Sequence, residues 1–293
     1  MQFPGEGEPS MRLRNFGPLK SQVPVIGQGT WKIADRGARA KRSVESLRLG
    51  IELGLNHLDT AELYGDGGAE EVISDAIAGR KRDTLFIVSK VLPQHASYRG
   101  TIQACNASLK RLRIDYLDAY LLHWQSRFPI DETMGALEEL VDQGKTRALG
   151  VSNFDVPDLE DAQRVLKRHP IACNQVLYHL RDRAAEAQVL PYCARHQIAI
   201  VGYSPFGQGD FPSARSRQGQ VLAKIAARHD ATPHQVALAF LTREPGTFTI
   251  PKASDIAHVR ENAGAGELVL NADDIAEIDA AFPLTKDAPL GAL

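Results

Sequence analysis

The sequence is poor in the features that mark disulfide-bonded and metal-binding proteins. It has only three cysteines, Cys105, Cys173 and Cys193, which lie far apart and form no CxxC pair. This spacing argues against both a disulfide framework and a zinc site, so we predict no metal. Isolated thiols are typical of a reducing compartment, and we therefore expect a cytoplasmic protein.

Long apolar runs and runs of one charge are also missing. No stretch reaches the ~18 consecutive apolar residues of a membrane span, and the start, MQFPGEGEPS, has no basic region followed by an apolar run. The 34 basic and 36 acidic residues are mixed along the chain and give a net charge of -2. Because no polybasic segment can neutralise phosphates, we expect no membrane, no nucleic acid and a small molecule as the partner.

The rest of the composition is that of an ordinary globular protein. Hydrophobic residues make up 43% and charged residues 24%, which is enough apolar material for a core. The length of 293 residues would allow two domains, but α/β barrels commonly reach ~250 residues as one. We predict a flexible tail over residues 1–10, with Met11 as a second candidate start, and one domain over residues 11–293. We expect a monomer.

Apolar periods alternate between helix and strand along the chain. Helical spacing over residues 40–53 is followed by a short buried strand that ends at Asp59. The alternation continues and predicts eight strands, ending at or spanning residues 28–31, 56–59, 85–90, 116–123, 146–151, 171–177, 198–203 and 247–251. Strands separated by helices pair in parallel through right-handed crossovers, and eight units favour a closed barrel over an open sheet. The predicted fold is α/β, a (β/α)8 TIM barrel.

Local signals place the helices and the two ends of the barrel. The predicted helices cover about residues 40–53, 69–78, 101–112, 132–143, 155–167, 186–196 and 219–229. Asp155 is expected as an N-cap, Gly144 as a C-cap, and Thr232 with Gln235 as a capping box that starts another helix. Residues 11–26 predict a β-hairpin that plugs one end of the barrel, and an extra C-terminal helix is expected at about 272–282.

Four titratable side chains follow the ends of successive predicted strands. Asp59 and Tyr64 flank the point where one strand runs out into a glycine-rich loop, Lys90 ends the next strand, and His123 ends the one after. Active sites of α/β barrels lie at this C-terminal face. Each residue also has an ordinary structural explanation, such as a helix N-cap for Asp59. Their order on consecutive strands nevertheless favours a catalytic group.

Several motifs connect these residues with a known family. The chain contains GLNHLDTAELYG, Lys90 after a strand, LLHW around His123, GKTRALGVSNF, Asn174-Gln175, GYSPFGQG and IPKASDIAHVRENA, in this order. In these motifs most of the chain resembles the aldo-keto reductase superfamily. The segment KASDIAHV is most similar to that of bacterial reductases of small aldehydes.

The resemblance implies NADPH-dependent reduction of aldehydes and ketones to alcohols by hydride transfer. Such a reaction leaves negative charge on the carbonyl oxygen, so it needs a proton donor. Tyr64 is the implied donor, Lys90 stabilises its phenolate, Asp59 holds Lys90 charged, and His123 hydrogen-bonds the carbonyl oxygen. At ~4 Å and an effective dielectric of ~20, an ammonium and a phenolate attract by about 4 kcal/mol.

No GxGxxG motif follows a strand, so a Rossmann cofactor site is excluded. The resemblance instead implies a dissociable dinucleotide across the barrel mouth, with Tyr203 under the nicotinamide ring and residues 204–207 along the pyrophosphate. Lys252 and Ser254 would contact the 2'-phosphate. The implied cofactor residues are Gly29, Thr30, Asp59, Ser152, Asn153, Gln175, Tyr203, Ser204, Pro205, Phe206, Gly207, Ile250, Pro251, Lys252, Ala253, Ser254, His258, Glu261 and Asn262.

The phosphate-binding segment departs from the family pattern at two positions. Ala253 stands where many members have serine, and His258 stands where many have an arginine that pairs with the 2'-phosphate. A neutral histidine is a weaker phosphate partner than a guanidinium. Lys252 keeps NADPH as the first choice, and the use of NADH stays open.

Trp31, Trp124 and Phe128 are expected to wall the substrate pocket. The loops that follow Trp124 and Gly207 are short, which favours an open pocket for small aldehydes. Two other functions stay open. Lys90 could form a Schiff base in an aldolase if its pKa were lowered, and the barrel could serve as a non-enzymatic sensor of nicotinamide nucleotides.

Overall fold

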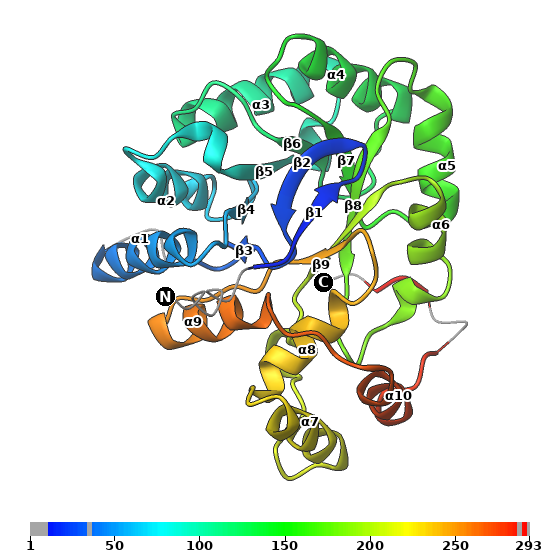
Figure 1. Ribbon diagram of the computed structural model, residues 1–293. Helices are drawn as coiled ribbons and strands as arrows, with labels where there is room; N and C mark the ends of the chain where they lie inside the picture. Colours follow the sequence, from blue (N-terminus) through cyan, green and yellow to red (C-terminus); the bar gives the residue numbers. More distant parts are fainter. Residues whose placement is uncertain (1–10, 34–36, 286–288, 292–293) are drawn as a thin grey trace, which may run out of the picture.

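Eight parallel strands form the centre of the molecule (Figure 1). The computed structural model describes residues 11–33, 37–285 and 289–291, so the tail predicted over residues 1–10 lies outside the described residues. The strands pair in chain order, each with the next: β3 (Gln28–Gly29), β4 (His57–Asp59), β5 (Phe86–Val91), β6 (Ala119–Leu122), β7 (Leu149–Ser152), β8 (Ile171–Leu177), β9 (Ala199–Tyr203) and β10 (Thr247–Thr249).

The first and last strands close the sheet into a barrel. Ile26 and Thr249 form a parallel bridge, and the Gly29 amide donates to the Pro251 carbonyl oxygen at 3.1 Å. Gly29 is required at this seam, because a Cβ there would lie only 2.5 Å from the Ile250 carbonyl oxygen. The predicted eight-stranded barrel is confirmed.

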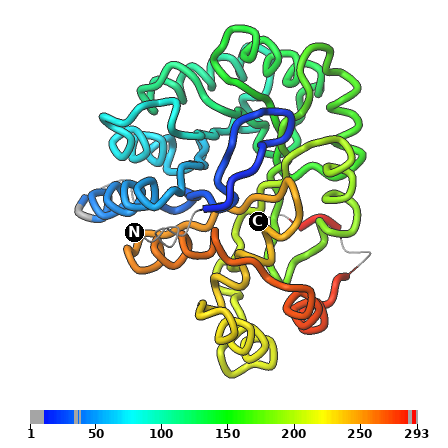
Figure 2. Tube along the Cα trace, viewed as in Figure 1, coloured from blue at the N-terminus to red at the C-terminus, as the bar shows by residue number. Residues whose placement is uncertain are grey.

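Helices surround the barrel, and Figure 2 shows α1 beside α9 although they lie far apart in the sequence. The helices are α1 (Gly37–Glu52), α2 (Gly68–Ile77), α3 (Tyr98–Leu112), α4 (Ile130–Asp142), α5 (Val156–Val165), α6 (Val189–Arg195), α7 (Arg217–Arg228), α8 (Pro233–Leu241), α9 (Ile256–Ala265) and the extra C-terminal α10 (Ala272–Ala281). Short 3-10 turns are η1 (Arg82–Thr84), η2 (Pro93–His95), η3 (Ala184–Glu186) and η4 (Gly207–Gly209). None of the helices in the described part has the length and hydrophobicity needed to cross a membrane.

The predicted helix ends agree with the caps in the structure. Asp155 and Thr232 both form capping boxes, and Gly144 has the positive φ of 69° that suits the end of α4. The helix predicted over residues 186–196 is shorter in the structure, where α6 begins only at Val189, after the turn η3. Helix α9 was not predicted.

A hairpin of β1 (Leu13–Phe16) and β2 (Leu19–Pro24) covers the N-terminal end of the barrel. Phe16 is fully buried, and its ring lies 5.8, 4.6 and 5.1 Å from those of His57, Phe86 and Phe248. These three residues belong to the barrel strands β4, β5 and β10. The hairpin therefore seals this end and leaves the opposite end for ligands.

The Phe16→Ala substitution should lower the free energy of unfolding by about 3–5 kcal/mol, because it opens a cavity in a closely packed barrel end. Urea denaturation followed by circular dichroism measures this difference. The Leu13→Ala variant is the matched control, since Leu13 lies in the same hairpin but is 51% exposed. Equal destabilisation by both variants would show that Phe16 does not anchor the hairpin.

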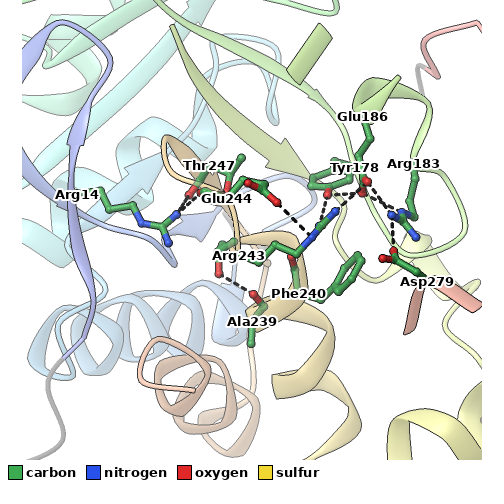
Figure 3. Close-up of polar contacts among 11 residues, drawn as sticks. Arg14, Tyr178, Arg183, Glu186, Ala239, Phe240, Arg243, Glu244, Thr247 and Asp279 are labelled. Carbon is green, nitrogen blue, oxygen red and sulfur yellow. Dashed lines mark hydrogen bonds and ion pairs between the residues drawn. The ribbon is translucent and has the colours of Figure 1, made fainter. Parts of the chain in front are cut away.

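A partly buried polar network joins η3, the end of α8 and α10 (Figure 3). Glu186 accepts hydrogen bonds from Tyr178 at 2.6 Å and from Arg243 at 2.8 Å. Arg183 pairs with Glu186 at 2.6 Å and with Asp279 at 2.7 Å. The network holds the extra C-terminal helix against the barrel.

Candidate active site

A cavity of about 580 Å³ opens at the C-terminal ends of the barrel strands. Asp59 ends β4, Ser152 ends β7 and Tyr203 ends β9, and all three line this cavity. Since the strands are parallel, their C-terminal ends share the face opposite the hairpin. A cavity of this size is suited to a small organic ligand.

Lys90 lies beneath the cavity and is fully buried. Its Nζ donates to Asp59 Oδ1 at 2.6 Å, to the Thr60 carbonyl oxygen at 2.8 Å and to Tyr64 Oη at 3.3 Å. The second carboxylate oxygen of Asp59 accepts from Gln175 Nε2 at 2.7 Å. The ammonium therefore has three acceptors, and both oxygens of the buried carboxylate are used.

The charge state of Lys90 follows from these contacts. Burial favours the neutral amine, but the carboxylate of Asp59 and the phenol of Tyr64 outweigh it, so the pKa of Lys90 is raised. The side chain is therefore an ammonium ion at neutral pH.

Two opposing effects act on the pKa of Tyr64. Burial raises the pKa of Tyr64, and the nearby charge of Lys90 offsets this only in part. Lys90 lowers the pKa of the phenol, as expected, but desolvation of the buried phenol raises this pKa by more. Tyr64 is thus protonated at neutral pH.

His123 lies beside Tyr64, with 5.7 Å between the two ring centroids. Burial and then the charge of Lys90 lower the pKa of His123 to about 2. The imidazole is consequently neutral, and its Nδ1 has no hydrogen-bond partner among the described residues. A neutral imidazole can donate one hydrogen bond to a ligand but carries no charge.

Amide and hydroxyl groups form another part of the cavity wall. Ser152 Oγ and the Asn153 amide both donate to the Gln175 carbonyl oxygen, at 2.9 and 2.8 Å. Tyr203 Oη donates to Asn153 Oδ1 at 2.9 Å, while Asn153 Nδ2 donates to the His123 carbonyl oxygen at 3.2 Å. This network connects the wall with His123.

The structure brings most of the predicted site residues together at the cavity. Those that line it are Gly29, Thr30, Trp31, Asp59, Tyr64, His123, Trp124, Ser152, Asn153, Gln175, Tyr203, Ser204, Pro205, Phe206, Ile250 and Lys252. Trp31 lies 5.0 Å from Tyr64 and Trp124 lies 4.7 Å from His123, measured between ring centroids.

Other predicted residues do not line this cavity. They are Lys90, which lies beneath it, and Phe128, Gly207, Pro251, Ala253, Ser254, His258, Glu261 and Asn262. Phe128 is partly buried and packs against the hydrophobic core. Glu261 accepts from Thr232 Oγ1 at 2.6 Å, next to the start of α8, and His258 is exposed on α9.

Three cavity residues, Lys32, Leu63 and Gln208, were not predicted. Each of the three is next to a predicted residue in the sequence, and this adjacency is the only sequence signal that could have identified it as a cavity residue. Lys32 and Gln208 have φ of 56° and 51°, and Asn153 and Ser204 have φ of 61° and 51°. Backbone strain of this kind in non-glycine residues clusters at ligand sites.

The fold and the site together define a barrel enzyme in which a buried lysine–aspartate pair lies beside a protonated tyrosine and a neutral histidine. The model of the Aldo/keto reductase family matches residues 25–282, and the chain belongs to this family. The resemblance seen in the motifs is thereby confirmed.

Relatives cover nearly the whole chain. Methylglyoxal reductase YeaE of Escherichia coli is 44% identical over 90% of this chain and 93% of its own length. Glyoxal reductase of Bacillus subtilis is 34% identical over 92% of each chain. An aldo/keto reductase of Klebsiella pneumoniae, solved with NADP and acetate, superposes with a TM-score of 0.89 at 40% identity, covering 97% of this chain and 100% of that one.

Proposed function

We propose that this protein reduces small aldehydes, and 2-oxoaldehydes such as methylglyoxal in particular, to alcohols with NADPH. The contact of Tyr64 with the buried Lys90–Asp59 pair at the cavity floor carries the proposal. The names of the related methylglyoxal and glyoxal reductases support the substrate class, and the NADP-bound relative supports the cofactor.

The cavity fits a nicotinamide dinucleotide in its chemistry. Ser152, Asn153 and Gln175 offer amide and hydroxyl groups on one wall, and the ring of Tyr203 offers a flat surface beside them. Ser204 and Pro205 extend this wall toward Lys252, whose cation suits a phosphate. The bound cofactor would supply the hydride.

In the proposed reaction Tyr64 gives its proton to the carbonyl oxygen as negative charge develops there. Lys90 stabilises the phenolate that remains, and Asp59 keeps Lys90 charged and oriented. His123, being neutral, donates a hydrogen bond to the same oxygen. Trp31 and Trp124 would border the carbonyl compound and exclude water from it.

The test is a panel of carbonyl compounds assayed by the loss of NADPH absorbance. Methylglyoxal, glyoxal and short aldehydes should give the highest kcat/KM, and bulky cyclic ketones the lowest, because the cavity has limited volume. No turnover of any small aldehyde, despite tight NADPH binding, would instead favour a nucleotide sensor.

The aldolase alternative has little support in the geometry. A Schiff base requires a neutral amine, whereas the pKa of Lys90 is raised and its three hydrogens have acceptors. Borohydride treatment with a carbonyl compound should therefore leave Lys90 unmodified. A stable adduct on Lys90 would contradict the reductase mechanism.

The Lys252→Ala substitution should weaken NADPH binding about tenfold, the loss of one charge-assisted contact, and leave NADH binding almost unchanged. Partial burial against the cavity wall lowers the pKa of Lys252 from its ordinary value. Since the ammonium is the form that binds phosphate, NADPH affinity of the parent should fall as pH rises through this lowered pKa. Dissociation constants from fluorescence quenching, measured for both nucleotides from pH 7 to 10, check this.

An equal response of NADPH and NADH to the substitution would show that Lys252 does not contact the 2'-phosphate. Ser254 and His258, which is exposed on the neighbouring helix, would then be the remaining candidates. The choice between the two nucleotides rests on these positions.

We also propose that residues 11–293 act as one domain, as a monomer in the cytoplasm. The one barrel that the described residues form and the three buried free thiols, Cys105, Cys173 and Cys193, support this view. Sedimentation equilibrium at micromolar concentration tests the oligomeric state.

A further inference from the structure

A buried carboxylate holds the far end of the turn that carries Tyr64. Glu70 lies in the first turn of α2, and its side chain is fully buried. One carboxylate oxygen accepts from Ser89 Oγ at 2.6 Å and the other from Arg111 Nε at 2.5 Å. Arg111 also donates to Ser108 Oγ at 3.2 Å. A buried charge is tolerated only when it is paired and hydrogen-bonded, and Glu70 is both.

Ser89 connects this carboxylate with the strand of Lys90. Ser89 and Lys90 are neighbours on β5, and successive side chains of a strand face opposite sides. Lys90 reaches Asp59 and Tyr64 at the cavity floor, whereas Ser89 reaches α2 among the surrounding helices. The Ser89–Glu70 bond therefore attaches α2 to β5 next to the lysine.

The chain between Tyr64 and Glu70 is a tight turn with an unusual backbone. Gly65, Asp66 and Gly67 have φ of 62°, 52° and 90°, and the Ala69 amide donates to the Tyr64 carbonyl oxygen at 3.1 Å. Glu70 is thus one residue away from the amide that fixes Tyr64.

Arg111 also packs directly on this turn. A Cβ on Gly67 would collide with the Arg111 guanidinium, so the arginine that pairs with Glu70 closes over the backbone of the turn as well. Arg111 on α3 therefore contacts both Gly67 and Glu70, and Ser89 on β5 contacts Glu70.

Tyr64 depends on this turn more than Asp59 does. Strand pairing fixes Asp59, which lies opposite Val88 in the β4–β5 register. Tyr64 lies outside the sheet, and its 3.3 Å contact is the longest of the three that Lys90 makes. A small shift of the turn would break this contact first.

We propose that Glu70 is a positioning residue, which through Ser89 and Arg111 holds the Tyr64 turn against β5 and so sets the contact of the phenol with Lys90. The proposal rests on the proposed function, since it takes Tyr64 as the proton donor. Glu70 does not line the cavity, so it acts only through Tyr64.

The test compares Glu70→Ala and Ser89→Ala with Glu71→Ala, which removes an exposed carboxylate from the same helical turn. Glu70→Ala should lower kcat for methylglyoxal reduction by about 10²-fold, the effect of a misplacement on the order of 1 Å. Ser89→Ala should lower it several-fold, and Glu71→Ala should not change it. NADPH dissociation constants should stay within about twofold in all three, because the cofactor wall is untouched.

The pH profile of kcat separates positioning from simple loss of folded protein. Reduction needs protonated Tyr64, so the rate falls as pH rises through the pKa of this phenol. Lys90 lowers that pKa, and a weaker contact with Lys90 would let it rise. The alkaline limb should therefore move to higher pH in Glu70→Ala and Ser89→Ala, and stay in place in Glu71→Ala.

An unchanged kcat in Glu70→Ala, or a lower kcat with the alkaline limb in its parental place, would overturn the proposal. If Glu70→Ala does not fold, the profile of Ser89→Ala decides in the same way. Retained activity in Tyr64→Phe would instead overturn the role of Tyr64 itself. The two failures are thus distinguishable.

Discussion

The Tyr64→Phe variant should lose about 10²–10⁴-fold in kcat for aldehyde reduction, the usual contribution of a positioned general acid. The substitution removes only the hydroxyl that lies 3.3 Å from Lys90 Nζ. His123 is a poor substitute as the acid because its imidazole is neutral, and Lys90 does not line the cavity. Steady-state kinetics with methylglyoxal, at saturating NADPH, measure the loss.

The NADPH dissociation constant of Tyr64→Phe should stay near the parental value, since the polar wall of Ser152, Asn153 and Gln175 is unchanged. Tyr98→Phe is the control, because Tyr98 is an exposed tyrosine at the start of α3. A variant that keeps on the order of a tenth of parental turnover or more would exclude Tyr64 as the acid.

The Lys90→Met variant should be equally inactive and also markedly less stable. It leaves the carboxylate of Asp59 buried without its ammonium partner, which costs about 3–5 kcal/mol in the free energy of unfolding. Urea denaturation measures the stability, and the aldehyde assay measures the activity. Because Tyr64 and Lys90 act as one unit, combining Lys90→Met with Tyr64→Phe should add little to the loss of either.

The double variant Asp59→Asn/Lys90→Met separates the two effects. It removes the uncompensated charge, so it should recover most of the stability while staying inactive. Recovery of activity together with stability would show that the lysine matters only for folding. Persistent instability would show that Asp59 is not the source of the loss.

The strand order could be predicted because at least one helix separates each strand from the next between Gln28 and Thr249. Caps such as Asp155 and Thr232 also have local causes, which the sequence contains. Helix α9 was missed because its residues, Ile256–Ala265, show no clear amphipathic period. The break before α6 accompanies the contact of Glu186 with Arg243, a residue far along the chain, which no local pattern reveals.

The site could be predicted in outline because parallel strands bring their C-terminal ends to one face. The sequence alone does not give the hydrogen bond from Gln175 to Asp59, which connects residues on opposite sides of the barrel. Nor does the sequence show how strongly burial desolvates Tyr64. This desolvation raises the pKa of the phenol although Lys90 lowers it.

The seam between β3 and β10 has a consequence for the synthesis of the chain. The Gly29 amide donates to the Pro251 carbonyl oxygen. Pro251 is synthesised only after nearly all of the barrel, so this bond cannot form earlier. Until then the nascent chain exposes unpaired strand edges, which invite pairing with other chains. We expect a chain that stops before Thr247 to aggregate, and barrel closure to limit the folding rate through its large loop-closure entropy.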